Sequence, residues 1–192
     1  MSVTDAIETV EKADLAVAEA AAPLQDHPVT KALGHLSELA DQPPMFALGA
    51  LVLAGGVVAG HPRATEAGLR LLLSVGLATA IKSAVKAGVA RTRPYVLANE
   101  GRYERSLLGP NEKDHNSFPS GHTADAVAAA RAEARVPAYG AAAAVAAIQI
   151  PRCAHYPSDI AAGALVGLAA EALADAILEG AARRAEPLLE RL

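Results

Sequence analysis

The sequence predicts an all-α protein, a compact bundle of about five to six helices that is embedded in a membrane. Alanine accounts for 47 of the 192 residues and aromatic residues for only 3%, a composition that favours helices over strands. The segment from Gln42 to Pro62 contains no Asp, Glu, Lys or Arg. Its apolar part falls just short of the roughly 20 residues that cross a bilayer. These observations indicate helices, of which at least one spans a membrane.

The individual helices follow from the spacing of apolar residues and from the residues that end each run. An amphipathic pattern over residues 4–22 closes at Pro23, and a second short pattern over 29–39 ends before two prolines. We expect further helices over residues 42–62, 69–89, 122–135 and 157–178, and an uncharged stretch over 139–150. Residues 91–119 are polar and rich in turn formers, which predicts a long loop, and long loops often carry function.

The length of the chain fits one domain over residues 1–192. Within it we expect amphipathic N-terminal helices over residues 1–40, a core over 42–178 and a charged tail over 179–192. An apolar content of 52% excludes intrinsic disorder. The single cysteine excludes a disulfide framework and multi-cysteine metal sites. The net charge of -4 argues against nucleic acid as a partner.

Short arginine-bearing segments alternate with the expected helices. If residues 42–62 span the membrane, the turns at 61–70 and 131–137 and the tail arginines Arg183 and Arg184 fall on one side. The positive-inside rule makes that side cytoplasmic. The loop over 91–119 and the turn at 152–157 then lie on the opposite side. We therefore expect a multi-pass protein of the cell (inner) membrane with its active site on the non-cytoplasmic face.

Three short clusters of polar residues fall on that non-cytoplasmic face. They are KAGVARTRPY, SFPSGHTAD and RCAHYPSD. The candidate functional residues are Lys86 and Arg93 in the first cluster, Ser120, Gly121 and His122 in the second, and Arg152, His155 and Asp159 in the third.

These residue types fit phosphoryl transfer without a metal ion. The lysine and the two arginines supply cations for a phosphate dianion, and guanidinium groups bind its oxygens in pairs. A Ser-Gly pair ahead of a helix offers a hydroxyl and backbone N–H groups at the positive helix end. His155, with Asp159 four residues on, makes a nucleophile with an orienting carboxylate. His122 lacks a nearby carboxylate of that kind and suits the general acid that protonates the leaving group.

Together the clusters resemble the signature of the phosphatidic acid phosphatase type 2 superfamily. That signature is Lys-x6-Arg-Pro, then Pro-Ser-Gly-His, then Ser-Arg-x5-His-x3-Asp. The chain has Lys86 followed by Arg93 and Pro94, an intact Pro-Ser-Gly-His ending at His122, and His155 followed by Asp159 at the required spacing. The resemblance extends over most of the chain, because the helices before the first cluster and after the third also fit.

The resemblance implies an all-α core and metal-independent hydrolysis that uses no cofactor. It implies that His155 attacks phosphorus to give a phosphohistidine, that Asp159 supports it, and that His122 protonates the leaving group. The phosphate-binding residues that it implies are Lys86, Arg93, Ser120 and Gly121.

One position departs from the family pattern. The third-cluster arginine belongs six residues before the nucleophile, where this chain has Gln149. We expect Arg152, three residues before His155, to replace it at the phosphate, because loss of one such cation costs several kcal/mol of transition-state stabilisation. The alternative is a weakened site.

Several of these residues also have other interpretations. A metal site is an alternative for His115, His122, Asp125, His155 and Asp159. Their spacing matches no HExxH-like ligand set, so we expect no metal. Solvated surface charges are expected at Lys82, Arg102, Arg105 and Lys113. Cys153 is expected to be a small buried filler, with a thiol nucleophile as the alternative.

The sequence therefore predicts a phosphatase that acts on a lipid phosphate at the membrane surface. Prenyl pyrophosphates, phosphatidic acid and phosphatidylglycerol phosphate are all compatible substrates. The alternatives are a soluble non-specific acid phosphatase of the same superfamily, and a membrane protein that keeps the fold but has lost turnover.

Overall fold

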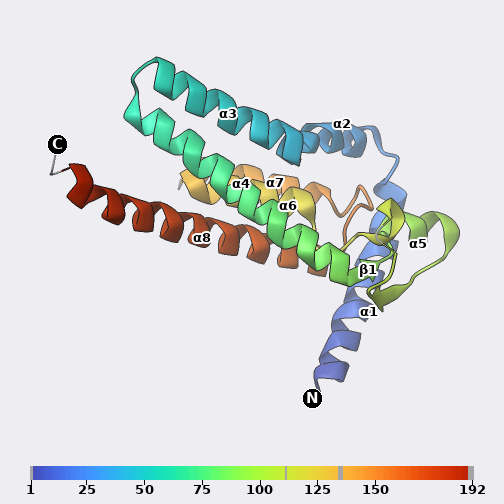
Figure 1. Cartoon of the computed structure of the whole chain (residues 1–192). Helices are drawn as coiled ribbons and strands as arrows, with labels where there is room; N and C mark the ends of the chain where they lie inside the picture. The colour runs from blue at the N-terminus through green and yellow to red at the C-terminus, as the bar shows by residue number, and fades with distance from the viewer. Residues whose placement is uncertain (1, 111, 134–135, 190–192) are drawn as a thin grey trace.

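The computed structural model describes residues 2–110, 112–133 and 136–189, and most of them are helical (Figure 1). Five helices pack lengthwise into a bundle. They are α3 (Gln42–Val58), α4 (Pro62–Gly88), α6 (Gly121–Glu133), α7 (Val136–Ile148) and α8 (Pro157–Leu189). This arrangement confirms the predicted all-α bundle. The final helix is longer than predicted, since it continues well into the segment expected to be a charged tail.

Two N-terminal helices lie at one end of the bundle, as Figure 1 shows. Helix α1 (Val3–Ala21) begins at Ser2, whose side chain accepts from the Asp5 backbone N–H while the Asp5 carboxylate accepts from the Ser2 N–H. A 3₁₀ turn η1 (Ala22–Leu24) follows it, then α2 (Pro28–Ser37) and a second 3₁₀ turn η2 (Glu38–Ala40). Helix α1 points away from the bundle axis, whereas α2 leads directly into α3.

The prediction of a long loop over residues 91–119 is wrong, because this segment contains several short elements. They are β1 (Val89–Arg91), α5 (Pro94–Glu100), β2 (Arg105–Leu107) and a 3₁₀ turn η3 (Lys113–His115). The two strands pair antiparallel. Helix α5 starts on a proline at its first position and ends at Gly101, which has a φ of 66°. These are ordinary start and stop residues for a helix, and its seven residues are too few for a clear periodic pattern.

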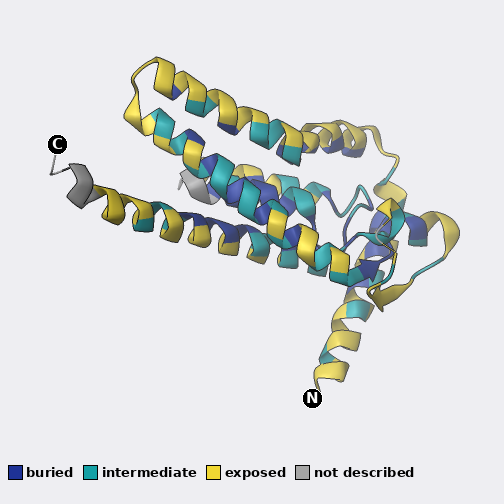
Figure 2. Ribbon diagram, viewed as in Figure 1, coloured by how far each residue is buried: buried dark blue, intermediate teal, exposed yellow. Residues whose placement is uncertain are grey.

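Small residues bring the helices of the bundle close together. Ala78, Ala128 and Ala170, from α4, α6 and α8, are fully buried in one cluster, and buried positions follow the inner faces of these helices in Figure 2. A Cβ at Gly163 of α8 would lie 2.5 Å from the backbone oxygen of Ser120. Only glycine permits this approach, so α8 holds the start of α6 directly against its own first turns.

Among the residues that the structure describes, two helices are long and apolar enough to cross a membrane, namely Pro62–Gly88 and Pro157–Ala185. At 1.5 Å per residue the 27 residues of the first span about 40 Å, more than the hydrocarbon core requires. Helices α2 and α3 qualify as a third span only as a pair, with a 49° bend between them. The predicted membrane run at 42–62 is therefore the second part of a bent pair. The protein is a membrane-embedded bundle.

Candidate active site

The three sequence clusters meet at the end of the bundle that carries α1 and the strand pair (Figure 1). Most of the candidate residues lie at the end of a helix or just before its start. Lys86 lies in the last turn of α4, Arg93 precedes α5, Ser120 precedes α6, His122 lies in the first turn of α6, His155 precedes α8, and Asp159 lies in the first turn of α8.

His155 is held in a single orientation by a backbone carbonyl. The side chain is buried, and its Nδ1 lies 2.7 Å from the carbonyl oxygen of Ser117. Because a carbonyl only accepts hydrogen bonds, Nδ1 carries the hydrogen and the lone pair of the neutral ring is on Nε2. Burial, opposed by Asp159 and aided by the positive charges of Arg93 and Lys86, lowers the pKa of His155 to about 4. At neutral pH the ring is therefore uncharged, with a free nitrogen.

Asp159 is fully buried and accepts three hydrogen bonds. They come from Ser117 Oγ at 2.5 Å, the Tyr156 backbone N–H at 2.9 Å and Arg91 Nη1 at 2.7 Å. Its nearest oxygen is 3.8 Å from His155 Nδ1, too far for a hydrogen bond. The expectation that Asp159 fixes the tautomer of His155 is corrected here: the Ser117 carbonyl fixes it. Ser117 links the two residues, since its carbonyl bonds the imidazole and its hydroxyl bonds the carboxylate.

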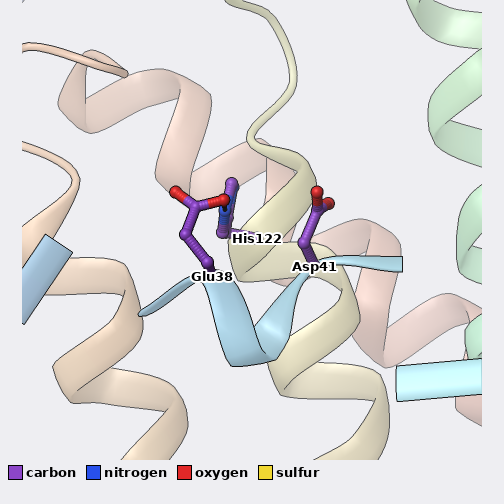
Figure 3. Close-up of side chains that lie close together, drawn as sticks. All are labelled: Glu38, Asp41 and His122. Atoms are coloured by element: carbon purple, nitrogen blue, oxygen red, sulfur yellow. Dashed lines mark ion pairs between the residues drawn. The ribbon is translucent and has the colours of Figure 1, made fainter. Parts of the chain in front are cut away.

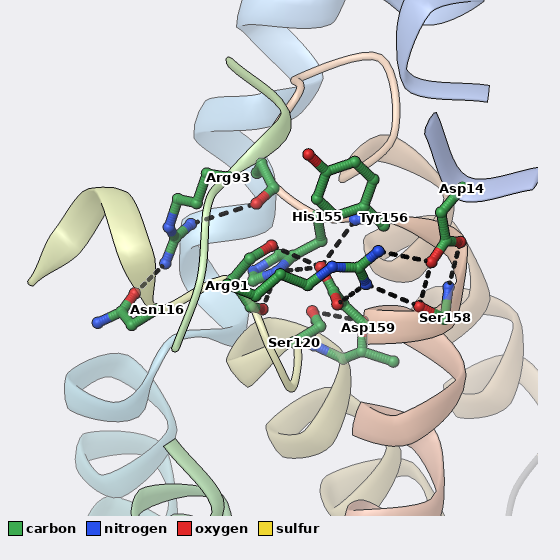
Figure 4. A network of polar contacts seen from close by, with 12 residues as sticks. Asp14, Arg91, Arg93, Asn116, Ser120, His155, Tyr156, Ser158 and Asp159 are labelled. Carbon is green, nitrogen blue, oxygen red and sulfur yellow. Dashed lines mark hydrogen bonds and ion pairs between the residues drawn. The ribbon is translucent and has the colours of Figure 1, made fainter. Parts of the chain in front are cut away.

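Behind Asp159 lies a buried ionic network that reaches the N-terminal helix (Figure 4). The Arg91 guanidinium bridges Asp159 to Asp14 of α1, with an Nη2–Oδ2 distance of 2.9 Å to Asp14. Asp14 also accepts from the Ser158 backbone N–H at 3.0 Å. The same guanidinium lies over the Tyr156 ring, 4.1 Å from its centroid. Every charge in this network therefore has a hydrogen-bonded partner, as buried charges require.

The roles of Asp14, Arg91 and Ser117 were not predicted from the sequence. Two of them carry a signal that is visible in the sequence. Asp14 is a charged residue within the apolar spacing of α1, and Arg91 lies inside the first cluster, between Lys86 and Arg93. Ser117 offers no such signal, because its role depends on a backbone carbonyl.

Lys86 and Arg93, the two candidate phosphate-binding cations of the first cluster, meet at Asn116. Lys86 Nζ donates to the Asn116 carbonyl at 2.6 Å, and Arg93 Nη2 donates to the Asn116 side-chain oxygen at 2.8 Å. Arg93 Nε is anchored on the Lys113 carbonyl at 2.8 Å. Burial lowers the pKa of Arg93. The oxygens that Lys86 and Arg93 contact here belong to neutral carbonyl and amide groups, so both positive charges are available to attract an anion.

Ser120 and Gly121 form the start of α6, as predicted. Ser120 is fully buried, and its backbone N–H donates to the Asp159 carbonyl at 2.9 Å. One turn deeper, Lys82 and Asp125 form a buried ion pair between α4 and α6. The expectation that Lys82 is a solvated charge is therefore wrong, since only 4% of the residue is exposed.

His122 lies opposite the 3₁₀ turn η2 and has two carboxylates beside it (Figure 3). Its Nε2 is 3.5 Å from Glu38 Oε2. The ligand atoms of Glu38, Asp41 and His122 all lie within 4.8 Å of one another. Burial lowers the pKa of His122, and the charges of Asp41 and Glu38 act in the opposite direction. The expectation that His122 has no nearby carboxylate is corrected, because carboxylates distant in sequence take that place.

Arg152 is held by the end of α2. Its Nη1 donates to Ser37 Oγ at 2.7 Å and its Nη2 to Glu38 Oε1 at 2.5 Å. Gln149, at the position of the family arginine, is fully buried and donates to the same Ser37 hydroxyl at 3.3 Å. Both residues therefore belong to the side of the site that η2 covers.

These contacts also bear on two alternatives raised by the sequence, a metal site and a thiol nucleophile at Cys153. Among the described residues, the group of three potential metal ligands is Glu38, Asp41 and His122, which differs from the set considered in the sequence. Cys153 is buried, and burial raises the pKa of its thiol. It is therefore a protonated thiol, which is a poor nucleophile.

Comparison with known proteins agrees with the fold and with the clusters. The chain resembles two crystal structures over most of its length. One is that of LpxE from Aquifex aeolicus, with 23% identity, a TM-score of 0.61, and coverage of 81% of this chain and 92% of that one. The other is that of a transmembrane PAP2-type phosphatidylglycerolphosphate phosphatase from Bacillus subtilis, with 20% identity, a TM-score of 0.65, and coverage of 90% and 87%. No curated protein sequence matches significantly.

A family model also matches a continuous part of the sequence. It covers residues 67–179, more than half of the chain and all three clusters. In the structure these clusters lie together at one end of the helical bundle. The match to the family model shows that the chain belongs to the PAP2 superfamily.

Proposed function

We propose that the protein is a metal-independent phosphatase that hydrolyses a phosphomonoester or pyrophosphate of a membrane lipid through a phosphohistidine intermediate. The observation that carries this proposal is the state of His155. Its ring is neutral, its Nδ1 hydrogen is fixed on Ser117 and its Nε2 is free. A nitrogen nucleophile of this kind, close to the charges of Lys86 and Arg93, suits attack on a phosphate.

In the proposed reaction, Nε2 of His155 attacks phosphorus while the bond from phosphorus to the leaving oxygen breaks. His122 gives its proton to that oxygen. Water then attacks the phosphohistidine, the neutral His122 accepts a proton from it, and the bond between phosphorus and His155 breaks. The products are the leaving alcohol (or phosphate ester) and inorganic phosphate, and both histidines return to their initial state.

Four of the remaining candidate residues are proposed to bind the phosphate. Lys86 and Arg93 supply two cations, and Ser120 and Gly121 supply a hydroxyl and N–H groups at the start of α6. Arg152 adds positive charge from its position on Ser37 and Glu38. Asp159 stabilises the positive charge that develops on His155, at 3.8 Å.

A lipid substrate is supported by the position of the site. It lies where α4 ends and α8 begins, so a membrane crossed by these helices has its surface at the level of the site. The turn between α3 and α4 lies at the other end of the bundle, and Arg63 follows it in the first turn of α4. By the positive-inside rule we place the site on the non-cytoplasmic face of the cell membrane.

The decisive variant is His155→Ala. In detergent-purified protein it should lower hydrolysis of lipid phosphates by about 10³-fold or more, whereas His35→Ala, an exposed histidine of α2, should leave it unchanged. Wild-type protein should form an acid-labile, base-stable phosphoenzyme, and hydrolysis should persist in excess EDTA. A His155→Ala variant that keeps activity, or EDTA-sensitive activity restored by Zn²⁺ or Mg²⁺, would overturn the mechanism. Absence of hydrolysis in the wild type would identify a protein that keeps the fold without turnover.

A further inference from the structure

The two carboxylates beside His122 have no part in the proposed attack on phosphorus. Glu38 reaches His122 and Arg152 with its two oxygens. Asp41 is the N-cap residue of α3, yet its side chain makes no capping hydrogen bond there, and its carboxylate lies in the group with Glu38 and His122 (Figure 3). Within the described part of the chain, Arg152 is the cation that pairs with this group, through Glu38.

The geometry places these carboxylates next to the leaving group. If His122 protonates the leaving oxygen, that oxygen lies within about 3 Å of the imidazole. Glu38 Oε2 lies 3.5 Å from Nε2 of the same ring. When Nε2 is the donor, the leaving oxygen is therefore within about 7 Å of a carboxylate.

The charge at that position discriminates between leaving groups. An uncharged alcohol meets no electrostatic penalty beside the carboxylates, whereas a leaving phosphate carries its own negative charge into a partly buried region of like charge. An alkoxide is also a poor leaving group that depends on protonation, and adjacent carboxylates favour the protonated imidazole. A phosphate leaving group depends less on protonation. Both effects favour the hydrolysis of monophosphates over diphosphates.

We propose that Glu38 and Asp41 are specificity-determining residues, and that the protein prefers lipid phosphomonoesters with an uncharged leaving alcohol over diphosphates. This inference rests on the proposed phosphatase function. It narrows the substrate class, because it selects against pyrophosphate substrates that the family signature allows.

The test uses two substrates with the same hydrocarbon chain, farnesyl monophosphate and farnesyl diphosphate. The wild type should hydrolyse the monophosphate with a kcat/KM roughly tenfold higher or more. Asp41→Asn and Glu38→Gln should each lower this ratio, and the double variant should lower it at least about fivefold, mainly by improving hydrolysis of the diphosphate. Glu100→Gln, an exposed carboxylate at the end of α5, is the matched control and should leave the ratio unchanged.

Each result has one consequence. Equal kcat/KM for the two substrates in the wild type, or an unchanged ratio in the double variant, overturns the inference while the phosphatase function stands. Hydrolysis of neither substrate overturns the proposed function itself. Higher salt should also reduce the wild-type ratio, since screening weakens repulsion between partly exposed charges, and a ratio independent of salt contradicts a charge-based origin.

Discussion

The two histidines of the site have different surroundings. On the nucleophile side, His155 and Asp159 are buried, and their contacts come from the carbonyl and hydroxyl of Ser117 and from the Arg91 network. On the leaving-group side, His122 faces side chains of the turn η2, and the Glu38 side chain is 47% exposed. One half is a closed network of satisfied charges, and the other is a partly open cluster.

This difference follows from what each half must do in the proposed reaction. The attacking nitrogen requires one tautomer and one orientation, which buried hydrogen bonds to fixed groups supply. The leaving-group side must admit part of the substrate, so its groups are partly exposed. We infer that changes on the nucleophile side affect the rate with any substrate, whereas changes on the leaving-group side affect the choice of substrate.

The largest effect outside the candidate catalytic residues is expected at Arg91. Its removal leaves Asp14 and Asp159 buried without their shared cation, a change that is strongly destabilising in buried ion networks. Arg91→Ala should lower kcat by about 10²–10³-fold, and Arg91→Lys should recover little, because one ammonium cannot bridge both carboxylates. The control is Arg105→Ala, a half-exposed arginine of β2. A near-normal kcat in Arg91→Ala would contradict the inference that the nucleophile side must be held rigidly for catalysis.

The same comparison explains what could be predicted from the sequence. The motif residues carry their signal in local spacing, and so Lys86, Arg93, Ser120, His122, His155 and Asp159 were placed at one end of a helical bundle. Asp14, Ser117 and Glu38 act through contacts with residues 38 to 144 positions away, which no local pattern reports. Helix α5 was missed for a different reason: at seven residues it is shorter than two helical repeats.

The second prediction concerns how the protonation of His155 depends on pH. Because its pKa is lowered to about 4, the neutral nucleophile should persist down to about that pH, well below the pH at which an ordinary histidine is protonated. For folding the sign is the reverse of a salt-bridged histidine: the unfolded chain binds the proton first, so stability falls as pH drops from about 6.5 to 4.

Nitrogen-15 NMR of histidine-labelled protein in micelles measures both features of His155. The resonance missing in His155→Ala should show a protonated Nδ1 and an unprotonated Nε2, and it should titrate with a midpoint near 4. A midpoint near 6.5, or the opposite tautomer, would contradict the role given to the Ser117 carbonyl.

A smaller effect is expected at Asp14, which touches the site only through Arg91 and Ser158. Asp14→Asn keeps an oxygen that accepts from the Ser158 N–H but removes the charge beside Arg91. We expect kcat to fall about tenfold with KM unchanged, because Asp159 then bears the Arg91 charge alone. Glu8→Gln, on the exposed part of the same helix, is the control. A change in KM alone would instead assign Asp14 to substrate binding.

The smallest rate effect is expected at Arg152, and it decides how the departure at Gln149 is understood. An arginine that contacted the phosphate directly would cost about 10²–10³-fold in rate when removed. In the structure both Nη atoms of Arg152 are engaged by Ser37 and Glu38, so we expect Arg152→Ala to lower kcat/KM for a monophosphate about tenfold or less.

Gln149→Arg should be harmful, because Gln149 is fully buried and shares the Ser37 hydroxyl with Arg152. A new guanidinium there would compete for that hydroxyl and lie close to an existing positive charge. If Arg152→Ala instead costs 10²-fold or more, Arg152 leaves Glu38 to bind the phosphate during the reaction. If Gln149→Arg raises activity, the natural site lacks a cation that the family pattern provides. Arg152 then affects which substrate is chosen and not the rate of phosphate transfer.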